Sequence, residues 1–307
     1  QRDDDGSFDY ASCNFHSAPD TAFCFKRLVA TYQLLKKYNF DDERLLKIQI
    51  RYRLMLEKAL KIISEGGFHT SNHRWAITAA LLIGANIFKE NKEFSKKLRL
   101  RADLYLNEGI DSDEDGDYAE HSTGNYNAVV NAALLSCYEA TKDEKFLSFV
   151  SKNLDMMLYY IDDEGVIFTQ NSTRQDRGKA ERIDKYFYQY LYMAQKTDSL
   201  EFQAAAHKMI YENQKAGKTA PDCLYLIMLH DYLEDYSFEL KGYKDEYRRY
   251  FQGAGVYRVK NKTFTYTVLK NKSKFLYIDF NGFLVGLRIG ESLAYVRNFI
   301  PTDLEIK

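Results

Sequence analysis

Three short polar stretches of the chain combine residue types that could carry out chemistry on an acidic ligand. They are 14–17 (Asn-Phe-His-Ser), 71–74 (Ser-Asn-His-Arg) and 120–127, which contains Glu, His, Asn and Tyr. Each lies at the predicted start of a helix, where free backbone N–H groups and the positive end of the helix dipole favour a carboxylate or a sulfate. One such stretch alone is most simply a solvated helix start. Three of them together favour a site.

The stretch from His69 to Trp75 is the best defined. It follows the Gly66-Gly67 break and precedes an apolar run, 76–88, that predicts a largely buried helix. The hydroxyl of Ser71 or Thr70 is expected to cap this helix by accepting a hydrogen bond from an amide of its first turn. Because the helix body is so apolar, we expect its polar first turn to line a cleft.

A loop at 169–177 is dense in side chains that hydrogen-bond to hydroxyls and carboxylates. Arg174 or Arg177 could clamp an acidic group of a ligand through paired hydrogen bonds. An ordinary solvated loop explains the same composition equally well, so both interpretations stay open. The loop also contains a glycosylation sequon at 171–173.

Metal binding is not predicted in the helical region. The run 111–117 (Asp-Ser-Asp-Glu-Asp-Gly-Asp) resembles the first half of a calcium loop, but Ser122 replaces the bidentate Glu that such a loop needs. An acidic turn is therefore expected. The cysteines lack zinc or redox spacing, and Cys13 and Cys24 are either free or bridged. No cofactor is expected, although a structural divalent metal in the β region stays open.

Composition restricts the class of partner. The 307 residues are 45% hydrophobic and 28% charged, with a formal net charge of -1. The charges form no basic block, which argues against nucleic acid as a partner. No run reaches the roughly 18 apolar residues needed to cross a membrane. The length allows one large domain or two.

Helices must position the polar stretches. The first is predicted from a Ser17 cap to about Lys37, and the second begins at Asp41 or Asp42. Further helices are predicted at 71–89, 92–108, 123–141, 143–160, 180–197, 199–215 and 221–236. No strands are expected among them, so the pattern favours a ring of helical hairpins, an (α/α) toroid, over a βαβ fold. In such a ring alternate helix starts face the same end, so the three polar stretches are expected to converge.

The hydrophobic period changes near residue 250. Short β-rich runs are predicted at 255–259, 263–268, 275–278 and 283–287, with turn signals between them. The predicted fold class is therefore mainly α and then β. An incomplete (α/α) toroid of helical hairpins is expected at 1–250, followed at 251–307 by the start of an antiparallel β-sheet, part of a β-sandwich domain.

Four motifs occur in a fixed order along the chain. They are N-F-H-S-x-P-D-T-A-F at 14–23, H-T-x-N-H-R-W at 69–75, D-x-D-x-D-G-x-Y-x-E-x-S-T-x-x-Y-N at 111–127 and R-Q-D-R-G at 174–178. In this order the chain resembles the heparinase II/III-like polysaccharide lyases over most of residues 10–290. The resemblance implies an (α/α) toroid followed by an antiparallel β-sandwich, and cleavage beside a uronic acid by β-elimination. It also implies a chain without the early toroid helices and most of the β domain, as in a part of a longer enzyme.

The resemblance further implies roles for matched residues. Asn72, supported by His73, would neutralise the uronate carboxylate and so make the C5 proton easier to remove. Tyr126 would protonate the leaving oxygen O4, and either Tyr126 or His73 would be the base. As a base, a phenol with an unperturbed pKa of about 10 needs a cationic neighbour, such as His73, His121 or Arg74.

Residues around this catalytic set are expected to bind the substrate. They are Asn14, His16, His69, Arg74, Trp75, Glu120, His121, Asn125, Arg174 and Gln175. His121 stands where the family motif has an arginine, which leaves the charge of that subsite open. Tyr118 is a weaker candidate for the role of Tyr126. No metal ligand is predicted.

Two other classes of function fit parts of the sequence. A glycoside hydrolase on the same toroid needs two carboxylates across the scissile bond, and Asp20 with Glu120 is the available pair. A non-catalytic glycan-binding protein needs neither. The lyase interpretation is favoured, with an acidic polysaccharide as partner and neither nucleic acid nor membrane. Secretion or a periplasmic location is expected from the size of such a substrate.

Overall fold

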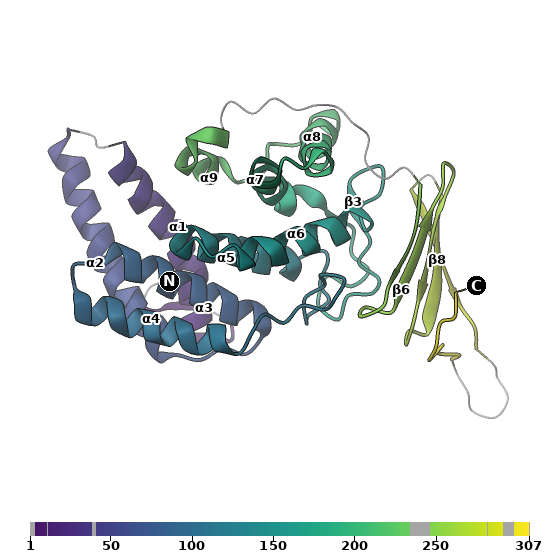
Figure 1. Ribbon diagram of the computed structural model, residues 1–307, viewed down its shortest axis with the longest axis horizontal. Helices are drawn as coiled ribbons and strands as arrows, with labels where there is room; N and C mark the ends of the chain where they lie inside the picture. Colours follow the sequence, from purple (N-terminus) through teal and green to yellow (C-terminus); the bar gives the residue numbers. More distant parts are fainter. Residues whose placement is uncertain are drawn as a thin grey trace. The chain divides into compact units, whose positions relative to one another are not determined.

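Figure 1 shows the computed structural model of the chain, which describes residues 4–10, 12–38, 41–233, 246–280, 282–290 and 298–306. Within these residues nine α-helices precede a five-stranded antiparallel sheet. This confirms the predicted order of helices first and strands afterwards. The chain divides into two compact units. Unit 1 comprises 1–111, 129–150 and 221–237, and unit 2 comprises 112–128, 151–220 and 238–307.

Unit 1 is built mainly from helical hairpins. Helix α1 (Ala18–Lys37) packs against α2 (Glu43–Glu65), and α3 (Ser71–Ile87) packs against α4 (Lys92–Asn107). Helix α3 also contacts both α1 and α2. The first four predicted helices are thus present, each close to its expected range.

The core of unit 1 lies between α1, α2 and α3. Phe25, Leu60 and Trp75 are completely buried. Gly84 lets α2 and α3 approach closely, because a Cβ at this position would stand 2.6 Å from a methyl carbon of Leu60. All residues of α3 from Trp75 to Leu82 are buried, which confirms that the apolar run forms a buried helix.

Side-chain caps set two of the helix starts as predicted. Ser17 accepts from the backbone N–H of Asp20 at the start of α1, and Asp42 accepts from that of Arg44 at the start of α2. The expected hydroxyl cap of α3 is wrong. Thr70 occupies the cap position, but its side chain makes no capping hydrogen bond.

The ends of unit 1 differ from the sequence expectation. Strands β1 (Phe8–Tyr10) and β2 (Asn14–Ser17) form an antiparallel pair before the first helix, where no strand was predicted. The expectation of no strands among the helices is wrong at 166–167 and 181–182, which form a short antiparallel pair. The helix expected at 221–236 is only α9 (Leu224–Leu229), followed by a 3₁₀ turn, η2, at Asp231–Leu233. Residues 234–236 of that prediction lie outside the described residues. Cys13 and Cys24 are both free thiols, so a bridge between them is not formed.

Helices α5 (Tyr126–Thr141) and α6 (Lys145–Leu158) each have residues in both units. The helix expected at 123–141 therefore begins at Tyr126, after a turn in which the backbone N–H groups of Asn125 and Asn127 both donate to the carbonyl oxygen of Ser122. This places Tyr126 in the first helical turn, as predicted.

The helical part of unit 2 contains a short pair of strands followed by a helical hairpin. Strands β3 (Val166–Ile167) and β4 (Glu181–Arg182) pair antiparallel, and a 3₁₀ helix, η1 (Ile183–Tyr186), leads into α7 (Phe187–Thr197). Helix α8 (Leu200–Lys215) packs against α7. The start predicted for a helix at 180 is wrong, because 181–182 pair with β3.

The C-terminal sheet of unit 2 is an antiparallel meander in the order β5-β6-β7-β8-β9 (Figure 1). Its strands are β5 (Tyr247–Phe251), β6 (Val256–Lys260), β7 (Thr265–Leu269), β8 (Lys274–Phe280) and β9 (Phe283–Arg288). The four predicted strands are confirmed to within two residues at each end. Strand β5 was not predicted, and it lies across the boundary expected at residue 250.

The register of the sheet gives it two different faces. Arg258, Thr267 and Tyr277 are paired across β6, β7 and β8 and share one face. Ile278 and Val285 are paired across β8 and β9 on the opposite face. No helix in the described part of the chain is long and apolar enough to cross a membrane.

Candidate functional site

The residues predicted for a site fall into two groups, one in each unit. The unit 1 group is Asn14, His16, His69, Asn72, His73, Arg74 and Trp75, and the unit 2 group is Glu120, His121, Asn125, Tyr126, Arg174 and Gln175. Within each group several members contact the same neighbours. Convergence of the two groups on one cleft stays a prediction.

The first turn of α3 is fixed by its own polar side chains. Asn72 is completely buried, and its Nδ2 donates to the hydroxyl of Thr70 at 2.9 Å. Ser71 Oγ donates to Asp111 Oδ2 at 2.8 Å. Both hydroxyls expected to cap the helix instead form hydrogen bonds with side chains. This explains why neither accepts a hydrogen bond from a backbone N–H of the first turn.

Arg74 holds this turn against the end of α4. Its Nη1 donates to Glu108 Oε2 at 2.6 Å and its Nη2 to Asp111 Oδ2 at 2.5 Å, with only 5% of its side chain exposed. A buried guanidinium that is paired in this way costs several kcal/mol to leave unpaired. The charge of Arg74 is balanced inside unit 1, so its role here is to position the α3 start.

The two histidines of the stretch differ in exposure. His69 is exposed and His73 is half-buried, and their rings meet edge to face with centroids 6.2 Å apart. The ring of Phe23, on α1, packs edge-on against His73 at 5.8 Å. His73 is thus held from two sides. Trp75 is completely buried, which corrects the expectation that its indole contacts substrate, because no face of the ring is open to a sugar.

The 14–17 stretch is strand β2 rather than a helix start. Asn14 Nδ2 donates to Asp20 Oδ2 at 2.7 Å and to Ser17 Oγ at 2.8 Å. His16 has a positive φ of 48°, and its Nδ1 lies 3.1 Å from Asp5 Oδ2. Asn14 therefore braces the start of α1, whereas the His16 side chain is exposed beside an acidic neighbour.

Tyr126 is the centre of the unit 2 group. It is half-buried at the first position of α5, and its hydroxyl donates to Gln175 Oε1 at 3.2 Å. The guanidinium of Arg174 lies over its ring, 5.2 Å from the centroid. The ring is thus covered by a cation, and the hydroxyl is oriented by an amide oxygen. Of the predicted residues, the structure brings these three together.

A buried carboxylate holds the 169–177 loop next to Tyr126. Asp176 is 4% exposed and accepts from Ser122 Oγ at 2.9 Å, Ser172 Oγ at 2.6 Å and the backbone N–H of Gly124 at 2.9 Å. Ser122 Oγ in turn accepts from the backbone N–H of Tyr126 at 3.0 Å. These bonds join the loop to the turn before α5, so the loop is not simply solvated. Sequence reasoning did not find Asp176, because its partners on that turn lie more than 50 residues away.

His121 is paired with a buried carboxylate. Its Nδ1 lies 2.8 Å from Asp117 Oδ2, and Asp117 Oδ1 accepts from Asn127 Nδ2 at 2.8 Å. The hydrogen bond with Asp117 raises the pKa of His121, burial opposes the rise, and the charges of Asp117 and Asp113 add to it. When protonated, His121 adds a positive charge to the unit 2 group.

The remaining members of the unit 2 group, and the weaker candidate Tyr118, are buried or hydrogen-bonded to residues other than Tyr126. Tyr118 is 1% exposed, and burial raises its pKa well above the usual range, so it is a poor candidate for the role of Tyr126. Glu120 is buried, and its carbonyl oxygen accepts from Thr173 Oγ1 at 2.7 Å. Asn125 Oδ1 accepts from Lys185 Nζ at 3.1 Å. Lys185 is a cation beside the group that the sequence did not single out.

The acidic run 111–117 forms a turn, as expected. Asp113 Oδ1 accepts from the backbone N–H groups of Asp115 and Asp117, at 3.0 and 2.8 Å. Within the described ranges, no group of three or more His, Cys, Asp or Glu side chains is arranged to hold a metal ion. Asn171 of the sequon is only 5% exposed.

Comparisons with known proteins add no family assignment. No protein-family model matches the chain, and no curated protein matches it in sequence.

Proposed function

We propose that this protein is a polysaccharide lyase that cleaves a uronic-acid-containing polysaccharide by β-elimination. The observation that carries the proposal is the setting of Tyr126. The residue is half-buried at a helix start, its exposed hydroxyl is bonded to Gln175, and the guanidinium of Arg174 lies over its ring. That environment suits a phenol that must exchange a proton with a sugar. The motif order that resembles the heparinase II/III-like lyases supports the same class.

The reaction breaks two bonds and forms a double bond. A base takes the C5 proton of the uronate, the C5–H electrons form the C4=C5 double bond, and the C4–O4 bond breaks. O4 leaves with a proton from the acid, so the products are a new sugar end and a 4,5-unsaturated uronate. No water is consumed, which separates this chemistry from hydrolysis.

The C5 proton is only weakly acidic, so the neighbouring carboxylate must be neutralised. We assign this step to Asn72, with His73 beside it at the start of α3. Because Asn72 is completely buried and its Nδ2 is bonded to Thr70, this role requires the first turn of α3 to open to the ligand. Preorganised donors of this kind typically contribute about 10²–10³ in rate. Arg74 and Asp111 are assigned to holding the turn in place.

Proton transfer is assigned to Tyr126 as the acid that protonates O4. As a phenolate, the same residue could first accept the C5 proton and then return it to O4, which leaves the enzyme unchanged after each turnover. His73 is the other candidate base. Arg174, His121 and Lys185 provide the positive charge that an anionic polymer needs.

The proposal includes the finer architecture that the resemblance implies. The packed pairs α1–α2, α3–α4 and α7–α8 are the hairpins of an incomplete (α/α) toroid, and the C-terminal sheet is the start of a β-sandwich. The partner is an acidic polysaccharide, with no catalytic cofactor. Action on a polymer places the protein outside the cytoplasm, secreted or in a periplasm.

A panel of uronate polysaccharides incubated with the intact protein tests the proposal. We expect a rise in ultraviolet absorbance from the unsaturated product on at least one polymer, and a loss of about 10²–10³ in that rate for Asn72→Ala. Reducing ends that appear without the absorbance would favour a hydrolase. Binding without either signal would favour a glycan-binding protein.

A further inference from the structure

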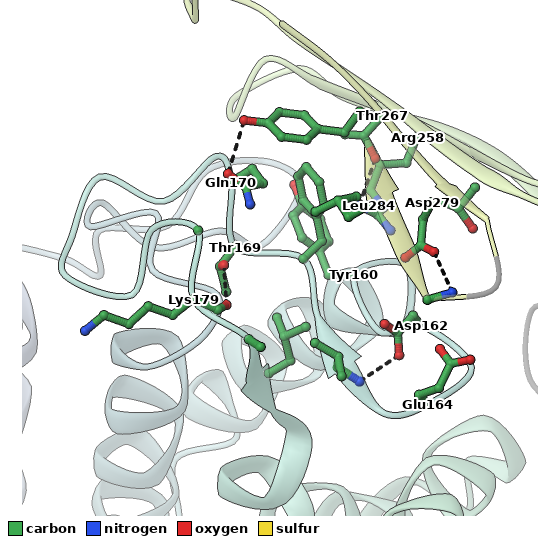
Figure 2. A pocket seen from close by; sticks show the side chains of 18 residues that line it. Tyr160, Asp162, Glu164, Thr169, Gln170, Lys179, Arg258, Thr267, Asp279 and Leu284 are labelled. Carbon is green, nitrogen blue, oxygen red and sulfur yellow. Dashed lines mark hydrogen bonds between the residues drawn. The ribbon is translucent and has the colours of Figure 1, made fainter. Parts of the chain in front are cut away.

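A cavity of about 350 Å³ lies within unit 2, between one face of the C-terminal sheet and the loops around β3 (Figure 2). The sheet contributes Arg258, Thr265, Thr267, Tyr277, Asp279 and Leu284. The other wall is formed by residues of 160–170 and 178–180. None of the residues predicted for the lyase site lines it. The volume is in the range of small-molecule sites in proteins.

Arg258 is an unusual group to find in this wall. It is 3% exposed, its Nε donates to the carbonyl oxygen of Tyr159 at 2.8 Å, and its Nη1 donates to Thr267 Oγ1 at 2.9 Å. Among the described residues it has no carboxylate partner, and its Nη2 donates to none of them. A buried cation without an anion is costly. The cavity therefore offers a positive charge and at least one free donor.

Two aromatic rings of the wall pack around Arg258. Its guanidinium lies 5.4 Å from the centroid of the Tyr160 ring and 4.5 Å from that of Phe168. Tyr160 is completely buried, and its hydroxyl has no surface open to the cavity. Tyr160 therefore supports Arg258 through its ring, and Arg258 is the group that can meet an anion.

The rest of the lining suits a hydroxylated ring. Phe168 and Tyr277 are aromatic walls, and Tyr277 is fixed by its hydroxyl bond to Gln170 Oε1 at 3.1 Å. Figure 2 draws Asp162, Glu164 and Asp279 on one side of the cavity, away from Gln170. Carboxyl groups accept hydrogen bonds from hydroxyls, and aromatic faces pack on the apolar face of a sugar ring.

We propose that this cavity binds one sugar-acid residue, with its carboxylate at Arg258 and its hydroxyl groups toward Asp162, Glu164 and Asp279. The anionic part of this assignment rests on Arg258 alone. The sugar part deepens the proposed function and rests on it. Neither Tyr126 nor Asn72 lines the cavity, so we expect it to bind a monosaccharide unit without cleaving it.

Calorimetric titration of the full chain with glucuronate and galacturonate tests the proposal. We expect one of them to bind, with glucose, which lacks the carboxylate, at least about tenfold weaker. Arg258→Met should weaken uronate binding about tenfold to a hundredfold, because it removes a charge-assisted hydrogen bond. Tyr160→Phe removes only a hydroxyl that the cavity does not expose, so it should leave uronate binding within about twofold of the native protein.

A cavity-filling variant guards against misfolding of the Arg258 variant. Leu284 lines the cavity and is 45% exposed, so Leu284→Trp should fold and abolish uronate binding. Tyr126→Phe should bind the monosaccharide as the native protein does. If no polymer is cleaved but uronate binds and is lost with Leu284→Trp, the proposed function falls and this site stands. Absence of uronate binding, or equal affinity in the native protein and Leu284→Trp, overturns the site.

Discussion

At the scale of single residues, the charge of His121 depends on its bond with the buried Asp117. When protonated, this histidine is the cation nearest in chain position to Tyr126. Its backbone φ of 43° is in the left-handed region, where a non-glycine residue is held only by its surroundings. The Asp117 bond is one such constraint.

Asp117→Asn should therefore lower the pKa of His121. The amide keeps the size of the carboxylate but removes its charge, so the bond no longer favours the imidazolium. Titration of the histidine ring protons by NMR measures this directly. Asp103→Asn is a control elsewhere in the chain and should leave the His121 titration unchanged. An unchanged His121 titration in Asp117→Asn would contradict the pairing.

The same bond makes a signed contribution to stability. The pKa of His121 is higher in the folded protein than in the unfolded protein. The pair therefore contributes its full stabilisation at pH values below the unfolded pKa of about 6.5. That stability is lost as the pH rises through the folded pKa. Any activity that needs the cation should fall over the same interval.

Asp162 is also predicted to make the fold less stable as the pH rises, but here the cause is burial of the charged form rather than loss of a paired cation. Burial raises its pKa from 3.8 to about 6, although its bond from the Val166 backbone N–H opposes the rise. The folded state therefore loses stability as the pH rises from about 4 to about 6. Asp162→Asn should be more stable than the native protein above pH 6 by about 1–3 kcal/mol, and little different near pH 4.

Urea unfolding at both pH values measures this difference. The neighbouring Asp163 is a matched control of opposite sign. Its pKa is lowered, because its hydrogen bond and ion pair with Lys260 outweigh the effect of burial. Asp163→Asn should thus be less stable than the native protein at pH 7. Equal pH dependence in the Asp162 variant and the native protein would refute the assignment.

At the scale of elements, the start of α5 and the 169–177 loop act as one piece. Asp176 joins them through Ser122, Ser172 and the Gly124 backbone. Its position brings Arg174 and Gln175 to the Tyr126 ring and hydroxyl. Activity should thus depend on a residue that never touches the substrate.

Asp176→Asn tests this coupling. An amide nitrogen cannot accept from the donors around it, so we expect a loss of roughly 1–3 kcal/mol in the free energy of unfolding. Lyase turnover should fall while the affinity for polymer changes less, because the loop no longer holds its place beside Tyr126. Asp41→Asn, on the exposed surface, is the control. Unchanged stability and turnover would show that Asp176 is not the anchor.

The sequence predicted correctly those elements whose signals, such as a helix cap or an apolar run, lie in neighbouring residues. The Ser17 and Asp42 caps and the buried α3 run are set by neighbours in sequence, and all three were found. Strand β5 was missed because Arg248 and Arg249 are adjacent, which puts a charge on each face and removes the alternating pattern. The helix start predicted at 180 is wrong because residues 181–182 form strand β4, which pairs with β3. A local sequence pattern does not show a contact between two separate segments.

The candidate site shows the same limit. Tyr126 and Asn72 were predicted as site residues because each lies in a recognisable helix start, and their roles stay predictions. Trp75 was misjudged, since an aromatic residue beside polar ones can point into the core as well as out of it. Asp176 and Lys185 act on residues about 50 to 60 positions away, and no local pattern reports such a contact. The cavity at Arg258 likewise exists only once the sheet meets the β3 loops.

At the scale of the whole molecule, the sheet of unit 2 has one apolar face that the described residues leave open. Phe280, Phe283 and Val285 are 53%, 75% and 65% exposed. Ile278 and Leu287 share this face and are also exposed. Open apolar faces of this kind commonly mark a contact surface or a tendency to aggregate.

Charged substitutions on this face test its state in solution. Phe283→Lys with Val285→Lys should reduce self-association and the binding of a hydrophobic dye, without lowering the melting temperature by more than a few degrees. Light scattering and dye fluorescence measure both effects. The double variant Arg248→Glu with Lys262→Glu, also on the C-terminal sheet and its turns, is a control for surface charge alone. A large loss of stability in the lysine variant would instead show that the face is covered.

The central claim is that Tyr126 moves a proton in β-elimination. Its most direct test is the rate of ultraviolet absorbance increase on the best uronate polymer, compared between the native protein, Tyr126→Phe and Tyr211→Phe. Tyr211 is 54% exposed on α8 and serves as the matched control. We predict a loss of about 10²–10⁴ in Tyr126→Phe with the fold and polymer binding retained, and no loss in Tyr211→Phe. A Tyr126→Phe variant that forms the unsaturated product at the native rate would contradict the account.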